Sequence, residues 1–133
     1  MNKFVLDACA VLALIKGEQG MDIVRDTIES DAEILLHSVT FLEIYYNIVK
    51  ALGFDCADIY FEHMKQTKIN IVYQITENTI KNAGYYKSKY KISLGDSFVL
   101  ASAKEHNAKI VSSDHHEFDV IEERENINIL WIR

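Results

Sequence analysis

The sequence predicts an α/β fold with a central parallel sheet, because short apolar strand segments alternate with helical segments from end to end. Its 133 residues and 49% hydrophobic composition suit one globular domain covering residues 1–133. Four acidic residues also stand where a strand ends or a helix begins. In a parallel sheet such positions gather at one edge, which makes these acids the first candidates for a functional site.

The N-terminal half is expected to contain two strands and four helices. The strands are the apolar runs at residues 3–6 and 33–36. The helices carry apolar residues on one side, and Gly53 stands where a helix commonly ends. Their expected positions are residues 8–15, 21–28, 41–52 and 54–64.

The C-terminal half is expected to contain three strands and two helices. A run rich in β-branched residues at 69–75 predicts the first of these strands. The helices are expected from Thr76 to about residue 90 and from Ser93 to about residue 107. The remaining strands are predicted at 109–111 and 127–132.

The four acids are Asp7, Glu43, Asp96 and Asp114, and each also has a structural explanation. Asp7 suits a helix N-cap, and Asp114 suits a turn after a strand. Glu43 and Asp96 each stand three residues after a hydroxyl residue, which is the spacing of a capping box. Together, however, four carboxylates at one edge repel one another, and a divalent cation removes that penalty. A purely oxygen ligand set predicts Mg²⁺ or Mn²⁺ rather than Zn²⁺.

Charge and composition restrict the classes of partner. The net charge of −6 argues against simple electrostatic capture of nucleic acid. Two bound divalent cations would add four charges and leave −2, so an RNA substrate stays compatible. The N-terminus lacks a secretory pattern, and the longest apolar run, at 8–15, is too short to span a bilayer. Cys9 and Cys56 have no metal or redox spacing. We therefore expect a cytoplasmic protein without a membrane segment.

Three segments together resemble the motifs of PIN-domain nucleases, as found in VapC-type toxins. They are FVLDACAVLALI, SVTFLEIYYNI and ISLGDSFVLASAKEHNAKIVSSDHHEFD, and the resemblance covers nearly the whole chain. It implies a three-layer α/β/α sandwich around the parallel sheet. It also implies a metal-dependent endoribonuclease that leaves 5′-phosphate and 3′-hydroxyl ends. Members of this family commonly form homodimers and, in toxin systems, are inhibited by a small antitoxin protein.

The same resemblance assigns roles to the acids. Asp7, Glu43 and Asp96 correspond to the core acids and Asp114 to the fourth, all four being catalytic and metal-binding. Asp119 would add a fifth ligand or support the others. The resemblance therefore implies a site for one or two Mg²⁺ or Mn²⁺ ions.

Other residues carry open alternatives. Cys9 stands where the family often has a hydroxyl or amide side chain, and Ser113 is a candidate for hydroxyl contacts to the site or substrate. The segment 85–91 interleaves tyrosines with lysines, which suits either RNA contacts or a helix C-terminus. His115 and His116 suit either contacts to substrate or metal, or an exposed turn.

Three functions are compatible with these patterns. The leading one is a metal-dependent endoribonuclease acting as the toxin of a toxin–antitoxin pair. The second is a catalytically silent PIN-like module that binds RNA or protein. The third is a receiver-like domain, in which one aspartate would accept a phosphoryl group.

Overall fold

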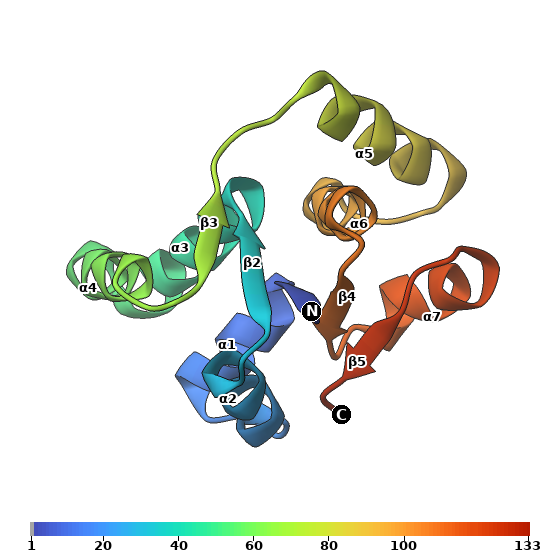
Figure 1. The fold of residues 1–133 in the computed structure, drawn as a ribbon. Coiled ribbons are helices and arrows are strands. Elements are labelled where there is room, and N and C mark those ends of the chain that lie inside the picture. Colours follow the sequence, from blue (N-terminus) through green and yellow to red (C-terminus); the bar gives the residue numbers. More distant parts are fainter. Residues whose placement is uncertain (1) are drawn as a thin grey trace.

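Five parallel strands form one sheet between two helical layers in the computed structural model, which describes residues 2–133 (Figure 1). The strands are β1 (Lys3–Leu6), β2 (Glu33–His37), β3 (Asn70–Val72), β4 (Lys109–Ser112) and β5 (Ile129–Trp131). The helices are α1 (Ala8–Lys16), α2 (Met21–Glu29), α3 (Ser38–Leu52), α4 (Phe54–Lys65), α5 (Glu77–Lys89), α6 (Leu94–His106) and α7 (His115–Arg124). The predicted parallel α/β architecture is confirmed.

The strand order is β3-β2-β1-β4-β5. Strands β2 and β3 are therefore added on one side of β1, and β4 and β5 on its other side. In the register Phe4 lies opposite Lys109 and Val5 opposite Ile110. The sheet therefore changes its direction of growth between β1 and β4. In open α/β sheets such a switch point leaves a crevice at the carboxyl ends of the two strands, where ligands bind.

Side chains of the central strands alternate between two hydrophobic cores. On β1, Leu6 belongs to the core under α1–α4, and Val5 belongs to the core under α5–α7. On β4, Val111 and Ile110 divide in the same way. This period-2 division explains why the strands read as continuous apolar runs: both of their faces are covered.

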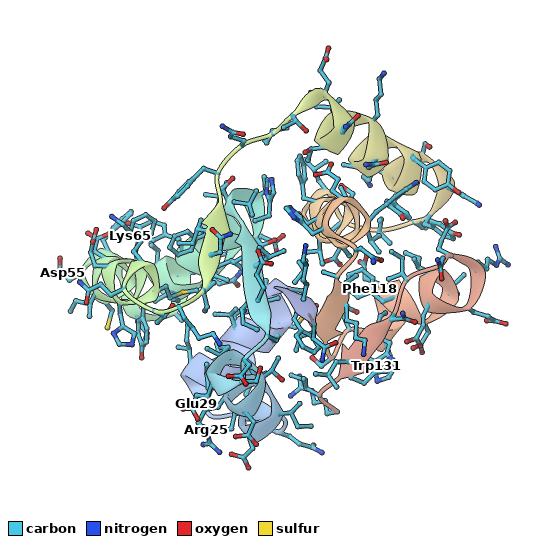
Figure 2. The ribbon with its side chains drawn as sticks, in the orientation of Figure 1. Arg25, Glu29, Asp55, Lys65, Phe118 and Trp131 are labelled. Carbon is cyan, nitrogen blue, oxygen red and sulfur yellow. The ribbon has the colours of Figure 1, made fainter. Side chains whose placement is uncertain are left out.

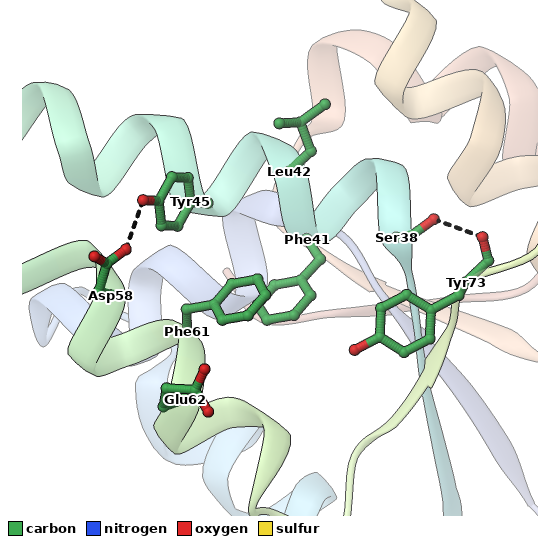
Figure 3. A pocket seen from close by; sticks show the side chains of 8 residues that line it. All are labelled: Ser38, Phe41, Leu42, Tyr45, Asp58, Phe61, Glu62 and Tyr73. Carbon is green, nitrogen blue, oxygen red and sulfur yellow. Dashed lines mark hydrogen bonds between the residues drawn. The ribbon is translucent and has the colours of Figure 1, made fainter. Parts of the chain in front are cut away.

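The two helical layers lie on opposite sides of the sheet in Figure 2, and the buried side chains of each layer belong to the core on its own side. Phe118 of α7 is fully buried and belongs to the core that α7 shares with α6. In the layer of α1–α4, Figure 3 shows Phe41 of α3 stacked on Phe61 of α4. The centroids of the two rings are 4.6 Å apart. Tyr45 donates a hydrogen bond to Asp58 at 2.6 Å beside this stack. These contacts fix α3, which carries one of the candidate acids.

The structure departs from the sequence prediction in three places. Strand β3 ends at Val72 rather than residue 75, because the carbonyls of Tyr73 and Gln74 accept hydrogen bonds from Ser38 and His37 instead of from a strand. Strand β5 is likewise shorter than expected, at Ile129–Trp131. Helix α7 was not predicted at all. No helix within residues 2–133 is long and apolar enough to cross a membrane.

Candidate metal centre

The candidate acids lie around the switch point between β1 and β4. Asp7 directly follows β1 and caps α1, whereas Asp114 follows β4 and caps α7. Because α1 and α7 cover opposite faces of the sheet, the two chain segments separate here. Helix α3 starts directly after β2, and the charge of Asp7 reaches Asp96 in the first turn of α6. All four segments therefore bring acidic residues toward this edge of the sheet.

Asp7 is the most enclosed of the acids, with an exposed fraction of 1%. One carboxylate oxygen accepts the N–H of Ala10 at 2.8 Å, and the other accepts the hydroxyl of Ser112. Burial raises the pKa of Asp7 to about 7, although these two hydrogen bonds act in the opposite direction. Asp7 is thus both a helix cap and a buried carboxylate with lone pairs left for a ligand.

Asp96 lies in the first turn of α6, where Ser93 is the N-cap and accepts the N–H of Asp96 at 3.1 Å. Burial raises the pKa of Asp96 to about 8, and the charges of four nearby acids raise it further. Those acids are Asp7, Glu117, Asp114 and Glu43. The structure therefore brings together all four acids of the predicted core around Asp96.

Glu117 is an additional acid at this site that the sequence prediction missed. Ligand oxygens of Asp96, Asp114 and Glu117 all lie within 4.8 Å of one another. Glu117 also accepts the N–H of Ser93 at 3.1 Å, which is the bond that the acid of a capping box would normally accept. Because Glu117 fills this role from another helix, the Asp96 carboxylate is not used as a cap. A signal was present in the sequence, since Glu117 stands three residues after Asp114, on the same side of a helix.

Glu43 approaches the cluster from α3. The helix begins at Ser38 and His37 is its N-cap, with the His37 ring accepting the N–H of Val39 at 3.1 Å. Glu43 therefore lies beyond the first turn, and the capping-box explanation for it was wrong. Burial raises the pKa of Glu43, and the charge of Glu117 adds to this effect. Its carboxylate lies against Gly95, the residue before Asp96.

Asp119 lies away from this cluster. Its carboxylate contacts Nδ1 of His115 at 2.8 Å, and His115 is stacked on Trp131 with ring centroids 3.7 Å apart. His115 and Asp119 are one turn apart on an exposed part of α7. His116 is also exposed. His115, held by Asp119, joins α7 to the C-terminal strand, and Asp119 is not among the acids around Asp96.

Ser112, and not Ser113, provides the hydroxyl contact at the site. The Ser112 side chain is fully buried, donates to Asp7 and accepts the N–H of Asp114 at 2.9 Å. It therefore fixes the positions of two acids at once. Cys9 lies close enough for the neighbouring acids to affect it, and burial raises the pKa of its thiol to about 12. A thiol with that pKa remains protonated near neutral pH in the metal-free protein.

The lysines of the segment 85–91 are largely engaged in contacts within the protein. Lys89 donates to Glu125 at 3.1 Å and lies over the rings of Tyr85 and Tyr90. Lys87 donates to the backbone carbonyl of Ile92 at 2.6 Å. The Lys89 contact ties the end of α5 to the end of α7, and the Lys87 contact ties α5 to the segment before α6. Both favour a structural role for this segment over RNA binding.

The chemistry of the acid cluster fits a hard divalent cation. The donors around Asp96 are carboxylate oxygens, and three of them lie close enough to share one ion. Burial is the main reason that the pKa values of Asp7 and Asp96 are raised, and the charges of the neighbouring acids raise them further. A cation of charge +2 would relieve that repulsion, and Mg²⁺ and Mn²⁺ prefer this ligand type.

Comparisons with known proteins agree with the fold. The family described as PIN domain matches residues 4–124. Among solved structures, VapBC from Salmonella typhimurium bound to DNA matches with a TM-score of 0.74 at 16% identity, covering 100% of both chains. VapBC2 from Rickettsia felis, bound to a promoter DNA fragment, gives 0.73 at 13% identity and covers 97% of this chain and 98% of its own.

A third solved structure is VapC20 of Mycobacterium tuberculosis, described as a toxin that cleaves the Sarcin-Ricin loop. It matches with a TM-score of 0.66 at 13% identity, covering 80% of this chain and 85% of its own. No curated protein sequence matches the chain. At these identities the solved structures support the fold, and the family match extends over nearly the whole sequence.

Proposed function

The chain belongs to the PIN domain family, and from that premise we propose that it is a metal-dependent endoribonuclease acting as the toxin of a toxin–antitoxin pair. The observation that carries the proposal is the gathering of five acids from four separate helices at the sheet's switch point. These acids are Asp7, Glu43, Asp96, Asp114 and Glu117. Such a cluster is costly for a fold unless a cation compensates it, which indicates a functional reason for keeping it.

Asp96, Asp114 and Glu117 would hold the cation, with Asp7 beside them. When bound, Mg²⁺ or Mn²⁺ supplies positive charge for the phosphate under attack and lowers the pKa of a water molecule. Ser112 and the N–H of Ala10 keep the Asp7 carboxylate in place. Glu43 would complete the cation's surroundings or orient the attacking water.

The charge of the protein makes the cation important for RNA as well. With a net charge of −6, the chain as a whole does not attract a polyanion. Two divalent cations at the cluster would offset four negative charges at the place where the phosphodiester must lie. We therefore propose that RNA binding at the cluster itself depends on the metal, and that cleavage leaves 5′-phosphate and 3′-hydroxyl ends.

A cleavage assay on total RNA tests this function. The wild-type protein is compared with Asp7→Asn and with Asp31→Asn, which changes an exposed acid away from the cluster. We expect cleavage with Mn²⁺ by wild type and Asp31→Asn, and none with chelator or with Asp7→Asn. Metal-stimulated RNA binding without any cleavage would instead support the silent RNA-binding module. Equal cleavage by wild type and Asp7→Asn would refute the proposal.

We further propose an antitoxin partner and a homodimer. Several structural neighbours are VapBC assemblies, which supports the antitoxin. Exposed apolar side chains beside the groove of Figure 3 support an interface between two copies: Leu42 is 61% exposed and Tyr73 is 60% exposed. Light scattering should give twice the monomer mass for wild type and the monomer mass for Leu42→Glu. A monomeric wild type would contradict the homodimer.

A further inference from the structure

We propose that Gly95 is a positioning residue that holds the Glu43 carboxylate in the metal centre, because a side chain at position 95 would occupy its place. This inference rests on the proposed function in assuming that Glu43 serves the cation. A methyl group built on Gly95 would lie 1.5 Å from Oε1 of Glu43 and 2.7 Å from its Cδ atom. Glu43 therefore lies directly on the first turn of α6.

The backbone does not require glycine at this position. The glycines with positive φ are Gly17, Gly20 and Gly53, whereas Gly95 is a helical residue within α6. Glycine is less favourable than alanine within a helix, so its presence there needs another reason. Space for the Glu43 carboxylate supplies that reason.

The chain offers a matched comparison in Gly84. It is the other helical glycine, on α5, and a methyl group built there would have no atom within 4 Å. Alanine at position 84 would therefore meet open space, whereas alanine at position 95 would meet a carboxylate. The two glycines separate the general effect of a helical Gly→Ala change from the effect on Glu43.

The expected displacement is large compared with the tolerance of a metal site. Ordinary contact between non-bonded heavy atoms is about 3.5–4 Å, so a gap of 1.5 Å requires the carboxylate to move by about 2 Å. The contacted atoms form the far end of a flexible side chain, so Glu43 should move while the helices stay in place. Functional groups must be held within about 0.5 Å of their working positions, which a shift of this size exceeds.

The position also explains how the fold tolerates Glu43 among other acids. Glu43 is only partly exposed and lies against Gly95, the residue before Asp96, so its carboxylate needs favourable surroundings. The first turn of α6 carries the partial positive charge of the helix dipole, which favours an anion close to it. Gly95 lets the carboxylate approach this turn, next to Asp96.

The test measures Mn²⁺ affinity by electron paramagnetic resonance of free Mn²⁺ for wild type, Gly95→Ala, Gly84→Ala, Glu43→Ala and the double variant Gly95→Ala/Glu43→Ala. We expect Gly95→Ala to weaken binding by about tenfold or more, and Gly84→Ala to leave it unchanged. In the Glu43→Ala background, Gly95→Ala should cause no further loss. In the metal-free protein, nuclear Overhauser contacts from the Glu43 methylene protons to residue 95 should change in Gly95→Ala.

Three outcomes would overturn the inference. The first is that Gly95→Ala binds Mn²⁺ as tightly as wild type. The second is that Gly95→Ala lowers Mn²⁺ affinity as much in the Glu43→Ala background as it does in wild type. The third is that the double variant fails to fold. If Gly95→Ala alone fails to fold, recovery of the fold in the double variant would still support the collision with Glu43. If wild type itself binds no Mn²⁺, the proposed function fails. The methylene contacts then still decide whether Gly95 positions Glu43.

Discussion

Replacing Asp96 by asparagine should stabilise the metal-free protein at pH 8. The change keeps the size of the side chain and removes a charge from a place where burial and four neighbouring acids oppose it. The pKa of Asp96 is about 8 in the folded protein and has an ordinary value of 3.8. This difference corresponds to roughly 6 kcal/mol at most. Part of that cost is shared with the neighbouring acids, so we expect a gain of about 2–4 kcal/mol.

The sign of the pH dependence follows from the same pKa values. Between about pH 4 and pH 8 the folded wild-type protein binds protons that the unfolded chain has released. Its stability is therefore highest below pH 3.8 as far as these groups are concerned, and falls as the pH rises toward 8. The advantage of Asp96→Asn should accordingly be largest at pH 8 and nearly absent at pH 4.

Urea unfolding can measure this difference through the fluorescence of Trp131, the single tryptophan of the chain. At pH 8 the gain should also raise the melting temperature by on the order of 10 °C. Asp31→Asn is the control and should change neither value by much. Mn²⁺ at about a hundred times its dissociation constant should stabilise wild type by about 2.7 kcal/mol and the variant far less. Equal or lower stability of metal-free Asp96→Asn at pH 8 would refute the electrostatic account of the cluster.

Three further predictions follow from individual contacts. Ser112→Ala removes the hydroxyl between Asp7 and Asp114. It should lower the free energy of unfolding by about 1–3 kcal/mol, as measured by urea unfolding. It should also lower Mn²⁺ affinity by about tenfold to a hundredfold, as measured by calorimetry. Mn²⁺ affinity should rise from pH 6 to pH 8, because Asp7 and Asp96 must first release protons, and a flat profile would count against their raised pKa values. Lys89 is held by Glu125, so Lys89→Gln should lower the melting temperature but leave the salt dependence of RNA binding unchanged. A flatter salt dependence would restore the RNA-contact interpretation.

The sequence predicted the sheet well because the central strands are covered on both sides. Runs such as residues 3–6 are apolar throughout, and the structure buries Val5 and Leu6 in different cores. Helix α7 was missed because its buried residues, Phe118 and Ile121, stand among charged and histidine residues. Two buried apolar positions in ten residues give a weak helical period, so the packing of α7 against the sheet decides the structure.

Asp7, Asp96 and Asp114 could be predicted because each stands next to the end of a strand or the start of a helix. Glu43 was expected at the start of a helix, but α3 begins at Ser38 and Glu43 lies beyond its first turn. Glu117 has only its spacing from Asp114 as a signal in the sequence. The contact that places it at the site, where the start of α6 meets the first turn of α7 at Ser93, is visible only in the structure. Asp119 was included because the family resemblance implies a fifth or supporting acid at this position. On a helix, however, it lies two positions beyond Glu117 and therefore on another side, where it contacts His115.

The claim that these acids form one divalent-cation centre is tested most directly by a crystal structure with Mn²⁺, using its anomalous scattering. The account predicts a strong anomalous peak at the switch point between β1 and β4, with carboxylate oxygens of Asp96, Asp114 and Glu117 in contact with the ion and Asp7 beside it. The peak should be lost in Asp96→Asn. The absence of any peak at this edge in the wild-type crystal, or a peak that persists unchanged in Asp96→Asn, would contradict the account.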